Sequence, residues 1–184
     1  MKVISASEMA RIEKKAIACG ASGSDFMYNA AYGIAKVVIK TRKERKLKRE
    51  VTLLCGSGNN AGDAYLCGIN LLQSGYNVVA YDISGTKKPS PLCKKHQKDF
   101  VAFGGDLINV KQSTAFKFQK KGIILDGIFG TGFKDEVTGS CKKIVTAANK
   151  SENFTISIDI PSGLNGTTGL AAESTIKADL TLFL

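Results

Sequence analysis

Residues 53–68, LLCGSGNNAGDAYLCG, decide the fold of this chain. An apolar run ends in a glycine turn, and an apolar pattern resumes after two asparagines and an aspartate. A short apolar run that ends at glycine is typical of a buried parallel strand, and the segment after the turn predicts a helix that stops at Gly75. The stretch therefore predicts a strand, a polar loop and a helix, which is the repeating unit of a parallel sheet.

The rest of the chain continues this alternation. Further strands are predicted at 77–83, 106–110, 122–127, 154–159 and 178–184, with helices at 61–75, 89–105 and 140–151. Two helices precede them, one capped by Ser5 or Ser7 and one that begins at Ser24 or Asp25. The prediction is an α/β fold, a three-layer αβα sandwich with a Rossmann-like, mostly parallel sheet and two N-terminal helices. Residues 1–184 are expected to form a single domain, and because the chain stops at a strand, its C-terminal end is expected to be truncated.

Composition is that of an ordinary globular domain, with 43% hydrophobic and 23% charged residues. No run approaches the roughly 18 apolar residues of a membrane span, and the N-terminal stretch has no apolar signal core. The five cysteines form no C-x-x-C pair, and a single histidine, His96, argues against a zinc site. We therefore expect a reduced, cytoplasmic protein in which Cys55 and Cys67 are buried, with a mitochondrial location left open.

Positive charge is concentrated in residues 40–49, KTRKERKLKR, which hold seven basic residues and one acid in a chain of net charge +10. Such a run can contact nucleic-acid phosphates, or it can be the solvated end of a helix, because cations suit helix C-termini. No aromatic residue interleaves with it, as a base-stacking surface requires. The favoured interpretation is the solvated helix end, with neither a nucleic-acid nor a membrane partner.

Three predicted strands end in polar or glycine-rich loops: GSGNNAGD (56–63), DGIFGTGFKDE (126–136) and DIPSGLNGTTG (159–169). Ligands of open α/β sheets bind beyond the carboxyl ends of the strands, so the three loops are expected to lie at one edge. The coincidence of the three, rather than any one of them, predicts a functional site.

The first loop also matches a relaxed dinucleotide fingerprint, G-x-G-x-x-[GA], through Gly56, Gly58 and Ala61. Asp82 ends the next strand, where a ribose-binding acid is expected. Against a conventional NAD dehydrogenase, two asparagines and Asp63 crowd a turn that should be small and neutral, and a second, substrate-binding domain is missing. A P-loop is excluded because no Gly-Lys-Ser/Thr follows the turn.

The other two loops each begin with an aspartate. Asp126 precedes Gly130–Gly132, whose backbone N–H groups can form an anion-binding nest or merely a turn that needs positive φ. Asp159 precedes Pro-Ser-Gly and can equally be a helix cap or a turn-former. Two carboxylates at neighbouring strand ends either hold a cation or shift each other's pKa for acid–base work. Asn60, Asp126 and Ser162 offer oxygen ligands, which suit a hard cation.

Together the loops resemble the YjeF N-terminal domain family, the NAD(P)H-hydrate epimerases. The family pattern runs G-x-G-N-N-G-G-D-G, then D-x-x-F-G-T-G, then D-I-P-S-G with a downstream T-G, then A-D-x-T. This chain has, in the same order, GSGNNAGDA, DGIFGTG, DIPSG with Thr168–Gly169, and ADLT. The opening SASEMARIEKKAIACGASGSDFMYNAA also resembles that of the family, so the resemblance covers nearly the whole chain.

The resemblance implies a substrate, a cation and partners. The family interconverts the R and S forms of NADH or NADPH hydrated at C6 of the nicotinamide ring (NADHX and NADPHX), so that a dehydratase specific for the S form can restore the cofactor. It also implies a homodimer and one potassium ion per subunit, held by Asn60, Asp126 and Ser162. The implied substrate contacts are Asn59, Asn60, Ala61, Gly62, Asp63, Gly130, Thr131, Gly132, Phe133, Lys134, Asp135, Glu136 and Asp159.

Epimerisation at C6 needs a proton donor and acceptor near that carbon. Two carboxylates in the loops, Asp159 and Asp126, are the catalytic candidates, and Asp159 is the favoured one.

The chain also departs from the family pattern. Ala61 and Ala64 replace glycines; Ala61 is harmless if it starts the helix, but costs roughly 1 kcal/mol if its φ must be positive. Residues 134–136 stand where the family often has an arginine, and Tyr28 where it has a glutamate. These departures and the positive charge support an alternative function, a non-catalytic YjeF-type scaffold that dimerises and binds RNA or a nucleotide ligand.

Overall fold

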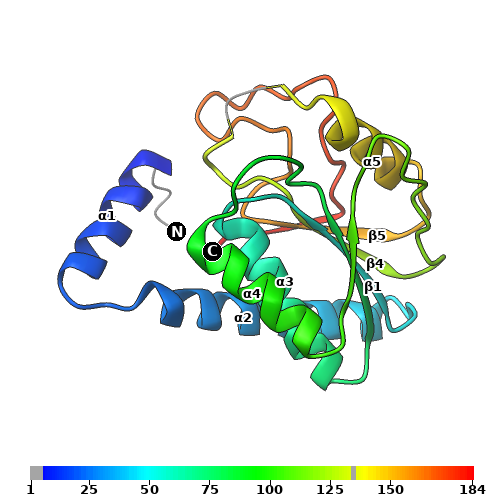
Figure 1. Ribbon diagram of the computed structural model, residues 1–184, viewed down its shortest axis with the longest axis horizontal. Helices are drawn as coiled ribbons and strands as arrows, with labels where there is room; N and C mark the ends of the chain where they lie inside the picture. Colours follow the sequence, from blue (N-terminus) through cyan, green and yellow to red (C-terminus); the bar gives the residue numbers. More distant parts are fainter. Residues whose placement is uncertain (1–5, 134–135) are drawn as a thin grey trace.

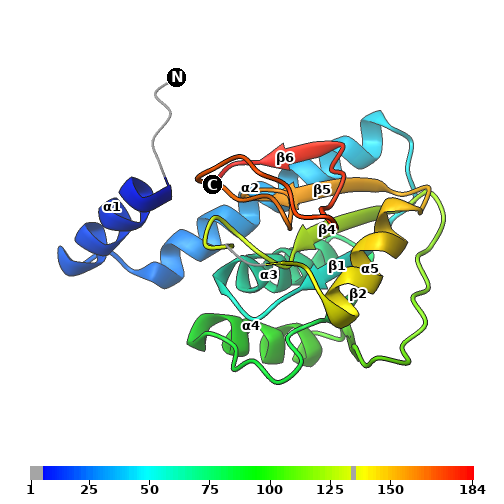
Figure 2. The same ribbon diagram turned by 90° about the horizontal axis from the view of Figure 1, so that it is seen from above.

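The computed structural model describes residues 6–133 and 136–184, which form a parallel sheet flanked by helices (Figure 1). The strands are β1 (Glu50–Cys55), β2 (Asn77–Asp82), β3 (Asp106–Asn109), β4 (Ile123–Gly127), β5 (Phe154–Ile158) and β6 (Leu180–Leu182). Their order is β3-β2-β1-β4-β5-β6, and every neighbouring pair is parallel (Figure 2). The predicted strands and the parallel sheet are confirmed.

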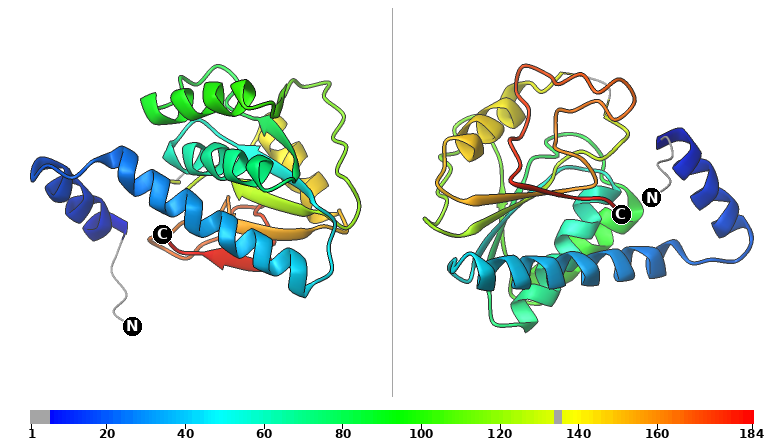
Figure 3. Two further views of the ribbon diagram at one scale, coloured as in Figure 1. Left: turned by 90° about the horizontal axis from the view of Figure 1, so that it is seen from below. Right: turned by 180° about the vertical axis from the view of Figure 1, so that it is seen from behind.

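The helices are α1 (Ala6–Ala18), α2 (Gly23–Glu44), α3 (Asn59–Gln73), α4 (Pro91–Ala102) and α5 (Gly139–Asn149). The helices α2, α3 and α4 cover one face of the sheet and α5 covers the other, so the three-layer αβα sandwich is confirmed (Figure 1). Helix α1 lies apart from the sheet and is joined to α2 by a short turn (Figure 3). Among the described residues, none of the helices combines the length and apolarity needed to cross a bilayer.

The helix starts correct the sequence-based expectations. Helix α2 begins at Gly23 because Ser22 caps it, accepting a hydrogen bond from the Asp25 N–H at 3.3 Å. Ser7 lies inside α1 and is not its cap, and Ser5 lies outside the described residues. Helix α3 begins at Asn59, two residues before the predicted start, with Gly58 as the N-cap. The two asparagines of the first loop are therefore the first residues of a helix.

Successive strand residues point to opposite faces and contribute to two separate cores. On β1, Leu53 packs with the α2 and α3 side chains, whereas Leu54 packs beneath α5. Residues 110–121 carry no helix, and they cover part of the α5 face with two aromatic rings. The rings of Phe116 and Phe118 lie edge-on to Tyr81, with centroids 5.6 Å and 6.0 Å away. Long loops thus complete the layer that α5 begins.

His96 of α4 is completely buried where α4 faces α2. Its ring lies edge-on to Tyr28, and its Nδ1 is 3.3 Å from Asp99 Oδ2 without the alignment of a hydrogen bond. Neither ring nitrogen has a hydrogen-bond partner among the described residues. Burial, with a smaller contribution from the charge of Lys95, lowers the pKa of His96, and Asp99 only partly opposes this.

The contribution of His96 to the free energy of unfolding is expected to fall as the pH drops below about 6.5, the pKa of an unperturbed histidine. The unfolded chain binds this proton more readily, so the contribution of neutral His96 is complete above that pH and is lost as the pH falls through the lowered folded-state pKa. His96 is the only histidine, so His96→Phe should remove this slope in urea denaturation between about pH 5 and pH 8. The buried Asp126, with its raised pKa, contributes a slope of opposite sign that remains in the variant. An unchanged slope in His96→Phe would contradict the assignment.

Candidate functional site at the carboxyl edge of the sheet

The loops that follow β1, β4 and β5 meet where the strand order reverses, between β1 and β4. This switch point is where open α/β sheets bind ligands. Hydrogen bonds connect the start of α3 with the second loop and with the last residue of β5, and connect the second and third loops with each other. The expectation that the three loops form one site is thus supported by their contacts.

Asp126 is completely buried near the end of β4 and joins two of the loops. Its Oδ1 accepts hydrogen bonds from Ser162 Oγ (2.6 Å) and the Ile128 N–H (3.2 Å). Its Oδ2 accepts from Ser157 Oγ and the Ser162 N–H, each at 2.8 Å. Burial raises the pKa of Asp126, while the four donors oppose the rise by favouring the carboxylate. A carboxylate accepts about four hydrogen bonds, so this geometry favours Asp126 as the group that positions the loops.

Asn60 is buried in the first turn of α3 and reaches the second loop and the last residue of β5. Its Nδ2 donates to the carbonyl oxygens of Phe129 (2.8 Å) and Ile158 (3.2 Å). The Phe129 N–H in turn donates to Ser162 Oγ at 2.9 Å. The backbone of Phe129 in the second loop is therefore held at both its N–H and its C=O, by a serine of the third loop and an asparagine of α3.

Asp159 has a left-handed backbone conformation, with φ 67°. It is the central residue of a three-residue turn, which is closed by a hydrogen bond from the Ile160 N–H to the Ile158 carbonyl oxygen (2.8 Å). Such a turn is strained for any residue except glycine, and strain of this kind is concentrated at functional sites. Asp159 Oδ2 accepts from the Thr131 N–H at 2.7 Å, and a Cβ at Gly130 would lie 2.8 Å from the same oxygen. Because Asp159 is only half-buried, its carboxylate can be reached by a ligand.

Two of the predicted cation ligands, Asn60 and Ser162, contact the backbone of Phe129, and the third, Asp126, bonds to Ser162. Ser162 Oγ lies 3.5 Å from the Phe129 carbonyl oxygen, to which Asn60 also donates. After donating to Asp126 and accepting from Phe129, the Ser162 hydroxyl keeps one lone pair. Serine, amide and carbonyl oxygens suit a hard cation such as potassium, so these residue types fit the group, and Asn60 would have to turn its amide oxygen towards the ion in place of the Nδ2 that now donates to Phe129. To coordinate it directly, Asp126 would have to exchange one of its four hydrogen bonds.

Residues 23–184, which contain the sheet and the three loops, match the family model of the YjeF-related protein N-terminus. The chain belongs to this family. The resemblance of the loop sequences is thereby confirmed, and each feature of the site described above lies inside the matched region.

Several relatives of this YjeF N-terminal chain carry functional names. A protein of Rhodopirellula baltica named NAD(P)H-hydrate epimerase is 33% identical to this chain, over 87% of this chain and 64% of that protein. A protein of the same name from Elusimicrobium minutum is 29% identical, over 98% of this chain and 84% of that protein. A bifunctional NAD(P)H-hydrate repair enzyme of Thermofilum pendens is 28% identical over 99% of this chain and 35% of that protein. The chain thus spans less than two thirds of the first relative and about a third of the last. The crystal structure of the yeast protein ynu0 has the same fold, with a TM-score of 0.79 at 24% identity, covering 98% of this chain and 79% of that chain.

The two alanines at which this YjeF domain departs from the family pattern lie inside α3. Neither Ala61 nor Ala64 has a positive φ, and both are completely buried. Ala61 therefore belongs to the helix, and the possibility of backbone strain at this position does not apply. A Cβ at Gly127 would lie 2.8 Å from the Ala64 Cβ, so the glycine on β4 makes room for the alanine on α3.

The remaining predicted substrate contacts lie around this cluster. Asn59 is exposed, and its Oδ1 accepts from Ser90 Oγ at 2.7 Å. Phe133 is buried and stacks on Phe129, with ring centroids 4.8 Å apart. Gly62 faces away from the loops, since a Cβ there would meet the Met27 side chain at 3.0 Å. Asp63 is buried in α3, Gly132 and Glu136 are exposed, and Lys134 and Asp135 lie outside the described residues.

Two polar contacts of the site were not predicted from the sequence. Ser157 is completely buried on β5 and donates to Asp126, and Ser90 donates to Asn59. For Ser157 a signal existed, because it is a polar residue in an apolar strand two positions before Asp159. For Ser90 there was none, because its partner lies on a different element.

Asp82, the acid that a dinucleotide fingerprint would place on a ribose, has other partners. It is buried, its Oδ2 accepts from Gln97 Nε2 at 2.8 Å, and its Oδ1 accepts from the Ser84 N–H at 2.9 Å. Both carboxylate oxygens thus bond within the domain, which disfavours the dehydrogenase interpretation.

All five cysteines are free, and Cys55 and Cys67 are completely buried as predicted. Cys93 lies beside the first loop, with its Sγ 3.9 Å from the Gly56 carbonyl oxygen. Burial raises the pKa of Cys93 to about 11, so its thiol stays protonated at neutral pH and packs as a small apolar group.

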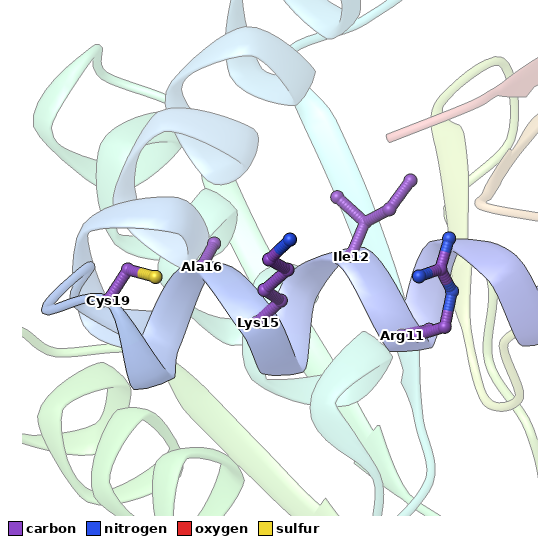
Figure 4. A pocket seen from close by; sticks show the side chains of 5 residues that line it. All are labelled: Arg11, Ile12, Lys15, Ala16 and Cys19. Carbon is purple, nitrogen blue, oxygen red and sulfur yellow. The ribbon is translucent and has the colours of Figure 1, made fainter.

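A hollow on α1 is separate from this site. It is lined by Arg11, Ile12, Lys15, Ala16 and Cys19, which lie on α1 and the turn after it (Figure 4). No residue of the three loops lines the hollow, so it contributes nothing to the cluster around Asp126 and Asp159.

Proposed function

We propose that this domain interconverts the R and S forms of NADHX and NADPHX, as an NAD(P)H-hydrate epimerase of nicotinamide cofactor repair. The names of the Rhodopirellula and Elusimicrobium relatives support this isomerase activity. The observation that carries the proposal is the position of Asp159, an accessible carboxylate in a strained turn, held 2.7 Å from a backbone N–H of the glycine-rich loop.

Asp159 is the proposed proton donor and acceptor at the C6 hydroxyl of the substrate. Delivery of a proton to that oxygen lets it leave as water, and removal of a proton from a water that adds to the opposite face of C6 gives the other epimer. The exchange is balanced, because one water leaves and one returns. The Thr131 N–H holds Oδ2, and among the described residues Oδ1 has no hydrogen-bond partner, so Oδ1 is the atom proposed to move the proton.

Asp126, the second catalytic candidate, is proposed to position the loops. Its carboxylate is inaccessible, and its four hydrogen bonds fix Ser162 and the turn after β4. With the Phe129 carbonyl, Asn60 and Ser162 would hold the potassium ion, and Asp126 would supply the balancing negative charge. When bound, this ion would add a fixed positive charge that orients the loops and the substrate.

Substrate phosphates are proposed to lie between α3 and the second loop. The first N–H groups of a helix have no intrahelical partner, and the Gly58 N-cap provides no side-chain hydrogen bond to them. Asn59 and Gly132 are exposed at this edge, so they can contact a large ligand directly. Of the predicted substrate contacts in 59–63 and 130–136, Asn59 and Gly132 are therefore the best placed, whereas the buried Gly62 faces Met27 of α2.

The partners and location belong to the same proposal. A dehydratase specific for the S form would consume the product, which agrees with the bifunctional name of the Thermofilum relative. Free cysteines suit a reducing compartment such as the cytoplasm. A homodimer remains an expectation that sedimentation of the purified chain would measure.

Turnover of pure (R)-NADHX, coupled to an S-specific dehydratase, is expected to exceed the spontaneous rate severalfold or more when this protein is added. We also expect a faster rate in potassium chloride than in tetramethylammonium chloride at equal ionic strength, because the larger organic cation cannot enter the oxygen cluster around Phe129. Equal rates with and without protein would contradict the proposed epimerase activity and favour the alternative, a non-catalytic scaffold. Equal rates in the two salts would contradict only the proposed role of potassium, and the proposed epimerase activity would stand.

A further inference from the structure

Most of the net positive charge lies at the edge of the sheet opposite the three loops. We define the basic edge as residues 40–49 together with Lys120 and Lys121. Residues 40–49 contain the end of α2 and lead into β1, and the two lysines lie shortly before β4. The basic edge holds nine basic residues and one acid, a net charge of +8 in a chain whose total is +10. The one acid, Glu44, pairs with Lys40 at 3.8 Å, and the other eight cations have no carboxylate partner among the described residues. Neighbouring charges of one sign repel each other, so this arrangement opposes folding.

Two lysines of the basic edge occupy a backbone conformation that favours glycine. The φ angles of Lys46 and Lys121 are 54° and 60°. After α2, the Leu47 N–H donates to the Arg42 carbonyl and the Lys46 N–H to the Lys43 carbonyl, a helix ending that usually has glycine at the Lys46 position. Lysine is about 1 kcal/mol less favourable than glycine in this conformation. The chain thus carries a positive charge at two positions where glycine would stabilise the turn.

The two turns form one continuous surface, because the Lys48 N–H donates to the Lys121 carbonyl oxygen at 2.8 Å. Two arginines are fixed on it, Arg45 over the Phe154 ring (5.3 Å to the centroid) and Arg49 over the Tyr76 ring (5.9 Å). Figure 3 shows α2 running from its junction with α1 to this far end of the sheet. The basic edge is therefore distant from the proposed active site, and the two can act independently.

We propose that the basic edge binds the phosphate backbone of nucleic acid without reading its sequence. The dipole of α2 accounts for cations in its last turn, but not for lysines in the two turns beyond it. Within the described part of the basic edge no large apolar or aromatic side chain is exposed, and Leu47 packs against the core. The surface therefore has nothing to insert into a bilayer and nothing to stack on bases, and contacts to phosphate remain.

This proposal revises the interpretation of residues 40–49 as a solvated helix end. The sequence shows the charges of that run, but not that Lys120 and Lys121 lie against it, nor that two of the lysines are held at positive φ. Both observations point to a charged surface rather than to a helix end alone.

The test compares the wild-type chain with Lys46→Gly/Lys121→Gly by fluorescence anisotropy, using a labelled single-stranded RNA and a DNA duplex. Wild-type affinity is expected to fall at least about tenfold between about 50 and 200 mM potassium chloride, as counterion release requires. The double variant should bind about tenfold more weakly, with a salt slope smaller by about 2. Its thermal unfolding midpoint should stay unchanged or rise, because glycine relieves both strained positions.

The matched control is Lys94→Gln/Lys98→Gln, which removes two exposed lysines from α4 and should change affinity less than about twofold. Equal weakening by the two double variants would overturn the proposal, as would the absence of wild-type binding at about 50 mM salt. Stronger binding to phosphatidylserine-containing vesicles than to either nucleic acid would also overturn it. Binding to RNA, DNA or both supports the proposal and identifies the polymer. Turnover of (R)-NADHX by the glycine variant should equal that of the wild type, so each proposal can fail without the other.

Discussion

Asp159→Asn is expected to lower kcat for NADHX epimerisation by about 10²–10⁴-fold while KM changes little. Asparagine has nearly the same volume, tolerates positive φ, and can accept the Thr131 N–H through its amide oxygen, so the turn and the second loop keep their positions. What the variant loses is the carboxylate that is proposed to accept and donate the proton. The measurement is the coupled assay on the R epimer, at substrate concentrations that determine kcat and KM separately.

Asp82→Asn is the control for Asp159→Asn. Asp82 also ends a strand, but it bonds to Gln97 and Ser84, outside the three loops. Its substitution should leave turnover within a few-fold of wild type, even if stability falls. If Asp159→Asn retains substrate binding and epimerises at a near-normal rate, Asp159 is not the proton-transfer group, and its strained turn would serve only to shape the loops.

Hydrophobic patterning was sufficient to predict the strands because each buried run is short and ends at glycine or a polar residue. The neighbours of each strand could not be predicted in the same way, because β1 pairs with β4 across more than sixty residues of intervening chain and no local signal marks that pairing. The start of α3 was also missed. Gly58 takes the cap position with an extended backbone, at φ −89°, so the helix begins at Asn59 although asparagine favours turns.

The three loops of the site were predictable, but the difference between its two aspartates was not. Asp126 is the last residue but one of β4, Asp159 directly follows β5, and both precede a glycine-rich segment. Their environments depend on tertiary contacts: Ser157 and Ser162 enclose Asp126, whereas the turn at Asp159 leaves that carboxylate half-buried. Sequence shows the type and order of polar groups, but burial and hydrogen-bond saturation decide which of them can move a proton.

Gly56→Ala is expected to lower the free energy of unfolding by about 3 kcal/mol or more, which corresponds to a fall of about 6–12 °C in Tm. Gly56 directly follows β1, and a Cβ there would clash with the carbonyl oxygen of Ile128, the first residue after β4. Relief requires movement of backbone rather than of a flexible side chain. Because the Ile128 N–H donates to Asp126, that movement also disturbs the cluster that positions the loops. Thermal and urea denaturation followed by circular dichroism measure the loss.

Gly58→Ala, in the same G-x-G stretch, separates the structural use of glycine from its use in binding. Gly58 has a φ of −89°, and a Cβ there would meet nothing within 4 Å, so we expect a loss below about 1 kcal/mol, from weaker capping of α3. A stable Gly58→Ala with a raised KM for NADHX would mean that the substrate occupies the space beside Gly58. Wild-type stability in Gly56→Ala would mean that the close approach of the β1 and β4 ends does not require glycine. In the expected case, only the second glycine of the apparent dinucleotide fingerprint is available to a ligand, and the first is required by the fold.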